Sequence, residues 1–109
     1  MPQFDVHRNK GRLSASIPFV VVVQSAQFDR YRRRVVVPLV LRSALPVGAP
    51  IAGTRMNPVF VLEGSDLVLH PLDTVSVALD ELGPRIGSLA EHGQQIADAM
   101  DELLTRSWG

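Results

Sequence analysis

The chain of 109 residues is long enough for one domain with a single modest core, and 46% of its residues are hydrophobic, too many for a disordered chain. Its 11 basic and 11 acidic residues balance, so bulk charge does not indicate direct binding to nucleic acid. The sequence contains no cysteine, no signal peptide and no apolar run long enough to span a bilayer. We therefore expect a single domain over residues 1–109, in the cytoplasm and without a membrane partner.

The first two-thirds of the chain has the pattern of short strands. Residues 3–6 alternate between polar and apolar and lead into a polar, basic loop over 7–16. The run IPFVVVVQS, residues 17–25, is typical of a strand buried on both faces or at a dimer seam. A second strand is predicted over 35–41. Within it, Pro38 predicts a bend, a bulge or an edge position, because proline cannot donate to a ladder.

A hairpin is the clearest local prediction. Residues 58–72 contain two apolar runs around the turn EGSD, in which Gly64 can adopt a positive φ. A loop rich in proline and glycine, residues 45–53, precedes it. Residues 73–82 alternate at first and then lose a clear pattern.

Towards the C-terminus the spacing of apolar residues changes to that of a helix. Apolar residues recur at helical spacing, namely Leu89, Ile96, Met100, Leu103 and Leu104. Ser88 and Glu91 have the spacing of a capping box, and Gly93 should weaken the first turn by about 1 kcal/mol relative to alanine. This order predicts a mainly β (α+β) domain, with antiparallel strands in a small barrel or curled sheet and one C-terminal α-helix.

The residues give no indication of catalysis, of a cofactor or of a metal site. His7, His70 and His92 lack metal-ligand spacing, and His70, inside an apolar strand, is expected to be a half-buried structural histidine. The adjacent carboxylates Asp80 and Glu81 should point in different directions, which disfavours a catalytic dyad. Three further acidic residues are expected on the solvated face of the helix: Asp98, Asp101 and Glu102.

A cluster of arginines is the strongest local charge feature: Arg30, Arg32, Arg33 and Arg34. It is either a solvated loop or a surface for an acidic protein segment or phosphates, because guanidinium groups form paired hydrogen bonds with such anions. The basic loop with Arg8, Lys10 and Arg12 extends that surface. Only Phe28 and Tyr31 interleave with the arginines, too few aromatic residues for a single-strand binding platform. The residues thus favour a binding module over an enzyme.

Residues 19–41, FVVVVQSAQFDRYRRRVVVPLVL, resemble the CcdB toxins of bacterial toxin–antitoxin modules. Those toxins carry a strand ending in V-Q-S, a polar loop with an R-R pair, and a strand with V-I-P-L. The matching residues are Val23, Gln24, Ser25, Arg33, Arg34, Val36, Val37, Pro38 and Leu39. The opening QFDV, the hairpin NPVFVLEG (57–64) and the terminal IADAMDELL (96–104) are also similar to elements of that family.

The resemblance implies a small SH3-like β-barrel with a side sheet and a C-terminal helix, in a homodimer that is not a catalyst. It implies a toxin that binds the A subunit of DNA gyrase and traps its cleaved DNA complex. It further implies that a disordered C-terminal segment of an antitoxin neutralises the toxin, and that the pair regulates its own transcription.

In that family, gyrase contacts come from the loop after V-Q-S and from the end of the terminal helix. An alignment on the helix's apolar face puts Thr105 at the family's critical tryptophan, whereas an alignment on the letters W-G selects Trp108 and Gly109 after three inserted residues. The candidate gyrase-binding residues are therefore Gln27, Phe28, Asp101, Leu104, Thr105, Trp108 and Gly109. The candidate antitoxin-binding residues are Arg8, Lys10, Arg12, Arg33 and Arg34.

Other interpretations stay open. Trp108 is an anchor for a partner, a ring docked on Leu104 four residues earlier, or part of a frayed end. A drifted homologue that binds antitoxin without poisoning gyrase is favoured by the polar Gln27, the displaced Trp108 and the missing final isoleucine. An endoribonuclease similar to the MazF toxins would use Arg32–Arg34, Thr54 and His70, but the opening motifs of that family are missing.

Overall fold

The structure, a computed structural model, describes residues 2–45 and 52–106, and the side chains of all of these except residues 105 and 106. Seven strands in this part of the chain form one antiparallel sheet: β1 (Asp5–Asn9), β2 (Phe19–Val22), β3 (Arg33–Leu41), β4 (Val59–Leu62), β5 (Ser65–Leu69), β6 (Val75–Ala78) and β7 (Leu82–Ser88). Helix α1 (Gly93–Asp101) follows the last strand and continues into a π-helical turn, η6 (Glu102–Arg106). These elements confirm the predicted mainly β (α+β) class, with one α-helix in the described part of the chain.

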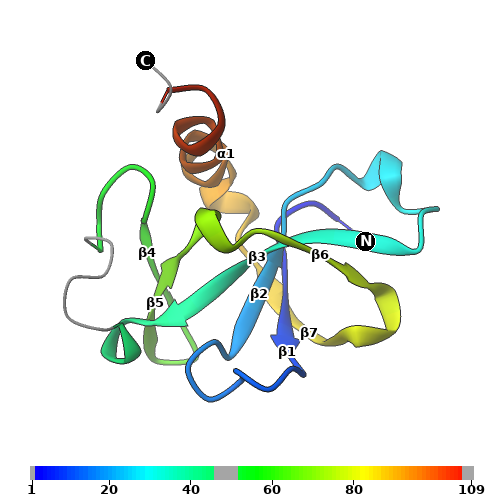
Figure 1. The fold of residues 1–109 in the computed structure, drawn as a ribbon, viewed down its shortest axis with the longest axis horizontal. Coiled ribbons are helices and arrows are strands. Elements are labelled where there is room, and N and C mark those ends of the chain that lie inside the picture. The colour runs from blue at the N-terminus through cyan, green and yellow to red at the C-terminus, as the bar shows by residue number, and fades with distance from the viewer. Residues whose placement is uncertain (1, 46–51, 107–109) are drawn as a thin grey trace.

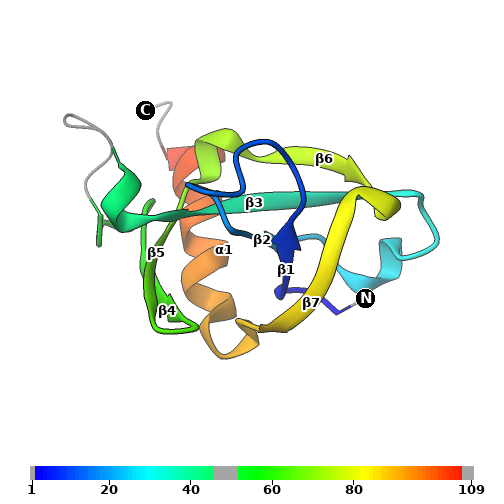
Figure 2. The same ribbon diagram turned by 90° about the horizontal axis from the view of Figure 1, so that it is seen from below.

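Strand β3 is the centre of the sheet because it has three neighbours. The strand order is β4-β5-β3-β2-β1-β7, and β6 also pairs with β3. On one edge β3 pairs with β2, while on the other edge its first half pairs with β6 and its second half with β5. The sheet curls into a half-barrel, with α1 and the β4–β5 hairpin at one end and the β6–β7 connection at the other (Figures 1 and 2).

Pro38 lies where β3 changes partners. Its register with β2 is regular, Val20 opposite Pro38, so the strand contains no bulge there. On the opposite edge, β6 pairs with residues 33–36 and β5 with residues 39–41. Of the three predicted possibilities, the local edge is the one observed: the position without an N–H donor falls in the gap between two partner strands.

The alternation of β2 divides the interior into two clusters. Phe19 and Val21 face a main core, which is covered by Ile96 and Ala99 of α1. Val20 and Val22 face the opposite side, where they pack with Val36 and a few partly buried residues of β6 and β7. All four residues of β2 are buried, which confirms a strand buried on both faces within one chain.

The predicted hairpin forms from β4 and β5, and its turn is tighter than the four letters EGSD suggested. Leu62 pairs directly with Ser65, which leaves Glu63 and Gly64 as the two turn residues. Both have positive φ angles, 50° and 77°, the signature of a type I′ turn. Gly64 adopts this conformation without steric cost. Glu63 is strained there, because its Cβ atom makes a positive φ unfavourable.

Three local predictions were wrong. Strand β1 extends to Asn9, into the segment predicted as a loop. Strand β7 forms where no strand was predicted, because its sequence LGPRIGS contains two glycines and a proline. The capping box is not formed: Ser88 Oγ accepts a hydrogen bond from the Ala90 N–H, and α1 begins later, at Gly93, after a 3₁₀ turn, η5 (Ala90–His92).

Gly93 is required by packing at the start of α1. Its backbone is ordinarily helical, but a Cβ atom there would lie 2.7 Å from Cε2 of the Phe4 ring. Phe4 itself has a φ of 71° and packs against the main core. The glycine that the sequence marks as a weakness of the helix therefore makes room for an aromatic ring from the other end of the chain.

Replacing Gly93 by alanine is expected to lower the free energy of unfolding by about 1–3 kcal/mol, since overpacking against Phe4 outweighs a gain in helix propensity of about 1 kcal/mol. Urea unfolding measures the change. In a Phe4→Ala background the same substitution should instead stabilise the fold. Stabilisation in the background with Phe4 intact would contradict the packing role of Gly93.

Candidate functional site

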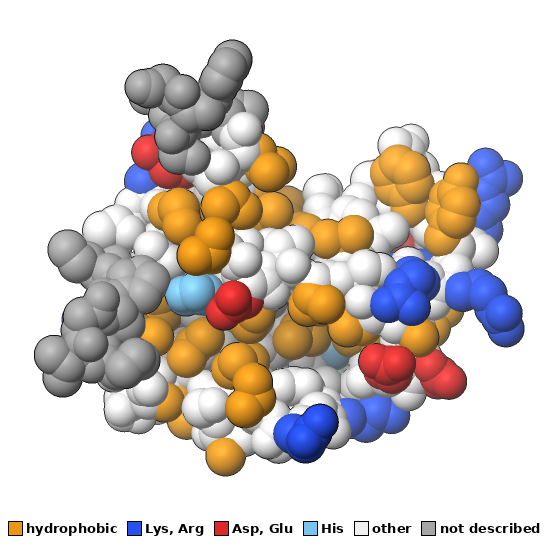
Figure 3. Space-filling view, viewed as in Figure 1, with side chains coloured by type: hydrophobic (Ala, Val, Ile, Leu, Met, Phe, Trp, Pro, Cys, Tyr) orange, Lys and Arg blue, Asp and Glu red, His pale blue; other side chains and the backbone are white. Residues whose placement is uncertain are grey.

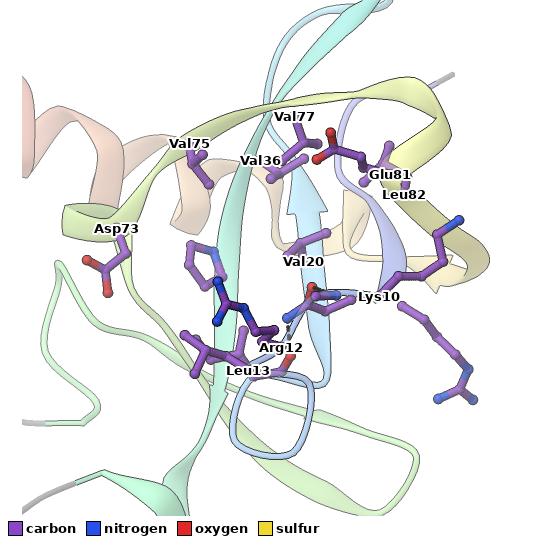
Figure 4. A pocket seen from close by; sticks show the side chains of 15 residues that line it. Lys10, Arg12, Leu13, Val20, Val36, Asp73, Val75, Val77, Glu81 and Leu82 are labelled. Atoms are coloured by element: carbon purple, nitrogen blue, oxygen red, sulfur yellow. Dashed lines mark hydrogen bonds between the residues drawn. The ribbon is translucent and has the colours of Figure 1, made fainter.

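A groove of about 540 Å³ opens on the second, smaller cluster of the interior. Its floor is aliphatic and includes Val20, Val36 and Val77, which also form or border that cluster. The β1–β2 loop forms one wall, with Lys10 and Arg12, while Asp73 and Glu81 stand on the β6 side (Figure 4). The groove thus has an apolar floor and charged walls, and its volume lies in the range of ligand and peptide side-chain sites.

The β1–β2 loop is held in shape by Asn9. The Asn9 amide donates to the carbonyl of Ile17, 2.8 Å away, and its Oδ1 accepts from the Gly11 N–H at 2.9 Å. The Leu41 N–H donates to the Ser16 carbonyl, which fastens the loop to β3. The wall of the groove is therefore tied to two strands, and its basic residues project from a fixed frame.

The three basic residues of this loop region have different partners. One terminal nitrogen of Arg8 donates to both oxygens of the Glu63 carboxylate, at 2.9 and 3.1 Å, and the guanidinium carbon lies 5.5 Å from the centre of the Phe19 ring. Lys10 Nζ donates to the Asp80 carbonyl, which leaves its charge uncompensated by a carboxylate. Arg12 is exposed on the rim. The structure thus brings Arg8, Lys10 and Arg12 together at one groove, whose lining does not include the arginine cluster that they were expected to extend.

Arg33 and Arg34 do not join that groove. Arg33 is exposed and binds Ser76 of β6, through Nε to the hydroxyl at 2.8 Å and through a terminal nitrogen to the carbonyl at 2.6 Å. Arg34 is only 2% exposed. Because successive residues of a strand point to opposite faces, the pair is divided between the surface and the interior.

The candidate gyrase-binding residues lie at two separate places. Gln27 and Phe28 are exposed on the 3₁₀ turn η1 (Ala26–Phe28), which is capped by Ser25 as its Oγ accepts from the Gln27 N–H at 3.3 Å. Asp101 and Leu104 are exposed at the end of α1 and in η6. The two places are well separated along the long axis of the molecule (Figures 1 and 2), so one protomer does not bring them together.

The other candidate residues at the C-terminus lie beyond what the structure describes. Trp108 and Gly109 fall outside the described residues, and the side chain of Thr105 does as well. The three interpretations of Trp108 therefore all stay predictions.

Arg55 ties the end of α1 to the loop before β4, a contact that the sequence did not indicate. Its Nε lies 3.2 Å from the Glu102 carboxylate, and a terminal nitrogen lies 3.8 Å from Asp98. Glu102 and Asp98 were expected on a solvated face, but both are partly buried. Asp101, between them, is exposed, as predicted.

The side chains suggested for a ribonuclease bond to other residues and not to one another. Arg33 binds β6, Thr54 Oγ1 accepts from the Asn57 N–H, and His70 lies 3.0 Å from the Asp73 carboxylate. The His70 side chain is 13% exposed, which confirms a half-buried position. Over residues 2–45 and 52–106, no three acidic, histidine or cysteine side chains are grouped to bind a metal ion. Nor does any helix in the same residues have the length and apolarity to cross a membrane.

Comparison with known proteins agrees with the resemblance of residues 19–41. A family model described as CcdB protein matches residues 3–106, nearly the whole chain. No curated protein matches it. The matched range includes the curled sheet, the groove, η1 and α1. The chain therefore belongs to the CcdB family, the toxins of toxin–antitoxin modules.

Proposed function

We propose that this protein is a toxin that binds the A subunit of DNA gyrase and traps the cleaved DNA complex, acting in the cytoplasm as a homodimer. The main support is the family match over residues 3–106. The segment after the V-Q-S motif is exposed on η1, as a contact surface must be. The proposal needs no catalytic group on this chain, because the poison acts by binding an intermediate of another enzyme.

The distance between the two candidate gyrase-binding surfaces, on η1 and at the end of α1, is consistent with action as a dimer. Phe28 on η1 and Leu104 on η6, 41% and 69% exposed, are large apolar side chains at distant places of one protomer. A second copy supplies a second set of both surfaces and gives a larger contact area for one gyrase subunit.

The groove is the proposed site for the antitoxin. Lys10 and Arg12 give one wall a positive charge opposite Asp73 and Glu81, Arg8 being paired with Glu63, and the aliphatic floor accepts apolar side chains. A disordered, acidic segment with interspersed apolar residues matches both properties and would fold on binding. Arg33 offers a further exposed cation outside the groove, whereas the buried Arg34 has no free face for a partner.

Expression of the chain without antitoxin is expected to arrest bacterial growth, and purified protein should accumulate cleaved DNA with gyrase. Trp108→Ala should weaken gyrase binding by about 30-fold or more if the indole is a contact centre, since such residues contribute about 2 kcal/mol or more. Binding of wild type and variant to immobilised gyrase A subunit gives the ratio.

Ser107→Ala is the matched control at the same end of the chain and should bind like wild type. Normal growth, together with an unaffected gyrase, would refute the poisoning role. Retained antitoxin binding in that case would identify a drifted homologue, the second candidate, which the polar Gln27 and the displaced Trp108 favour.

A Lys10→Ala, Arg12→Ala double variant is expected to escape neutralisation by the cognate antitoxin while its toxicity is unchanged. Loss of two positive charges should reduce the association rate of an acidic segment by about tenfold at low salt. Arg42→Ala, an exposed arginine 3.8 Å from Asp66 on a different part of the surface, is the charge-matched control. Undiminished neutralisation of the double variant would exclude the groove as the antitoxin site.

A further inference from the structure

The loop between β2 and β3 is wrapped around one buried side chain. The Arg34 guanidinium donates hydrogen bonds to four backbone carbonyls, those of Phe28, Asp29, Tyr31 and Arg33. The Asp29 carboxylate lies 3.8 Å away and is the acidic partner of this charge. The backbone from Phe28 to Arg33 is therefore held around the guanidinium group of Arg34.

Packing alone does not explain why the Arg34 guanidinium is buried. An arginine at 2% exposure loses its hydration, and one carboxylate at 3.8 Å with a few carbonyls compensates for it incompletely. An apolar residue would fill the position at lower cost, as Val36 does two residues later on the same face. What an apolar side chain lacks is the planar set of donors that gathers several carbonyls at fixed angles. Arg34 thus fixes the shape of the loop.

The outer surface of the fixed loop combines aromatic rings with free cations. Phe28 and Tyr31 are 41% and 56% exposed, and their ring centres lie 6.0 Å apart. Within the part of the chain that the structure describes, the guanidinium groups of Arg30 and Arg32 have no acidic or carbonyl partner. Apolar and basic side chains gather at this end of the molecule, over η1 and the following turn (Figure 3).

We propose that Arg34 is the positioning residue of this loop, and that Tyr31 joins Phe28 as a contact for an apolar pocket bordered by carboxylates on a protein partner. The inference rests on the proposed function, with the gyrase A subunit as that partner, and it adds Tyr31, Arg30 and Arg32 to the predicted contacts. A loop that is ordered before binding avoids the entropy cost of ordering in the complex.

A protein fits this surface better than nucleic acid does. The two rings pair with each other at an interplanar angle of 39°, which is not the set of separate, open faces on which successive bases stack. The formal net charge of the chain is +0, so no extended positive field supports a phosphate backbone. Two free arginines beside an aromatic pair are instead typical of the residues enriched at protein contacts.

The contact role is tested by Tyr31→Ala, Tyr31→Phe and Val61→Ala, compared for binding to purified gyrase A subunit. Tyr31→Ala should raise the dissociation constant at least about tenfold, whereas Tyr31→Phe keeps the ring and should bind like wild type. Val61, exposed on the distant β4, is the control for loss of a surface apolar group. Equal binding by Tyr31→Ala and Val61→Ala would overturn the contact role, and so would preferential binding of wild type to double-stranded DNA.

The positioning role is tested by Arg34→Lys and Arg33→Lys, which keep the charge but remove the planar donor set. Arg34→Lys should raise the amide exchange rates of residues 28–33 at least about tenfold while those of α1 and β4–β5 are unchanged. It should also weaken gyrase binding to a similar degree. Arg33→Lys should leave loop exchange as in wild type.

Unchanged exchange of the loop in Arg34→Lys would overturn the positioning role. Should Arg34→Lys fail to fold, Arg34→Gln and Asp29→Asn in the same exchange experiment take its place, because each removes part of the same set of contacts. Absence of gyrase binding by wild type would refute the proposed function and the Tyr31 contact, yet the exchange rates would still decide the role of Arg34.

Discussion

Strand β3 imposes the constraint on which the rest of the molecule depends: one of its edges has to serve two strands. β6 occupies the first half and β5 the second, and Pro38 stands between them with no donor to leave unsatisfied. Two strands thus share one edge of a sheet that curls and does not extend flat (Figure 2). The hairpin β4–β5 then lies beside α1 over the main core, while β6 and β7 enclose the smaller cluster (Figure 2).

The groove follows from the same division. Val20, Val36 and Val77 belong to a cluster too small to be closed on all sides, so its open side becomes the floor of a cavity. The β1–β2 loop covers part of it and places basic residues at the edge. The same three valines therefore pack in the interior and line the candidate binding surface. A substitution of any of them should affect both folding and binding.

Much of the fold was predictable from sequence because it depends on alternation. The buried β2, the β4–β5 hairpin with Gly64 and the amphipathic α1 all follow local rules of period and turn chemistry. Strand β7 could not be found in this way, because LGPRIGS pairs with β1 only through contacts distant in sequence. The same is true of Gly93, whose role depends on Phe4, and of Arg55, whose partners lie on α1.

Only part of the candidate site could be predicted from the sequence. Arg8, at the end of β1, and Lys10 and Arg12, in the loop that follows, line the same groove because they lie close together in the sequence. Arg33 and Arg34 were predicted to precede the strand over 35–41, but β3 begins at Arg33, and adjacent residues of a strand face opposite ways. No local rule, however, indicates that four carbonyls would gather on Arg34.

The contact of Phe4 with Gly93 has a consequence for how the chain folds during its synthesis. It joins Phe4, before β1, to the start of α1, and β1 also pairs with β7, so closure of the core depends on contacts between residues far apart in the sequence. Contacts of this kind form slowly because a long loop must close first. A chain still being synthesised has its first strands but cannot close its core until β7 and the start of α1 have left the ribosome.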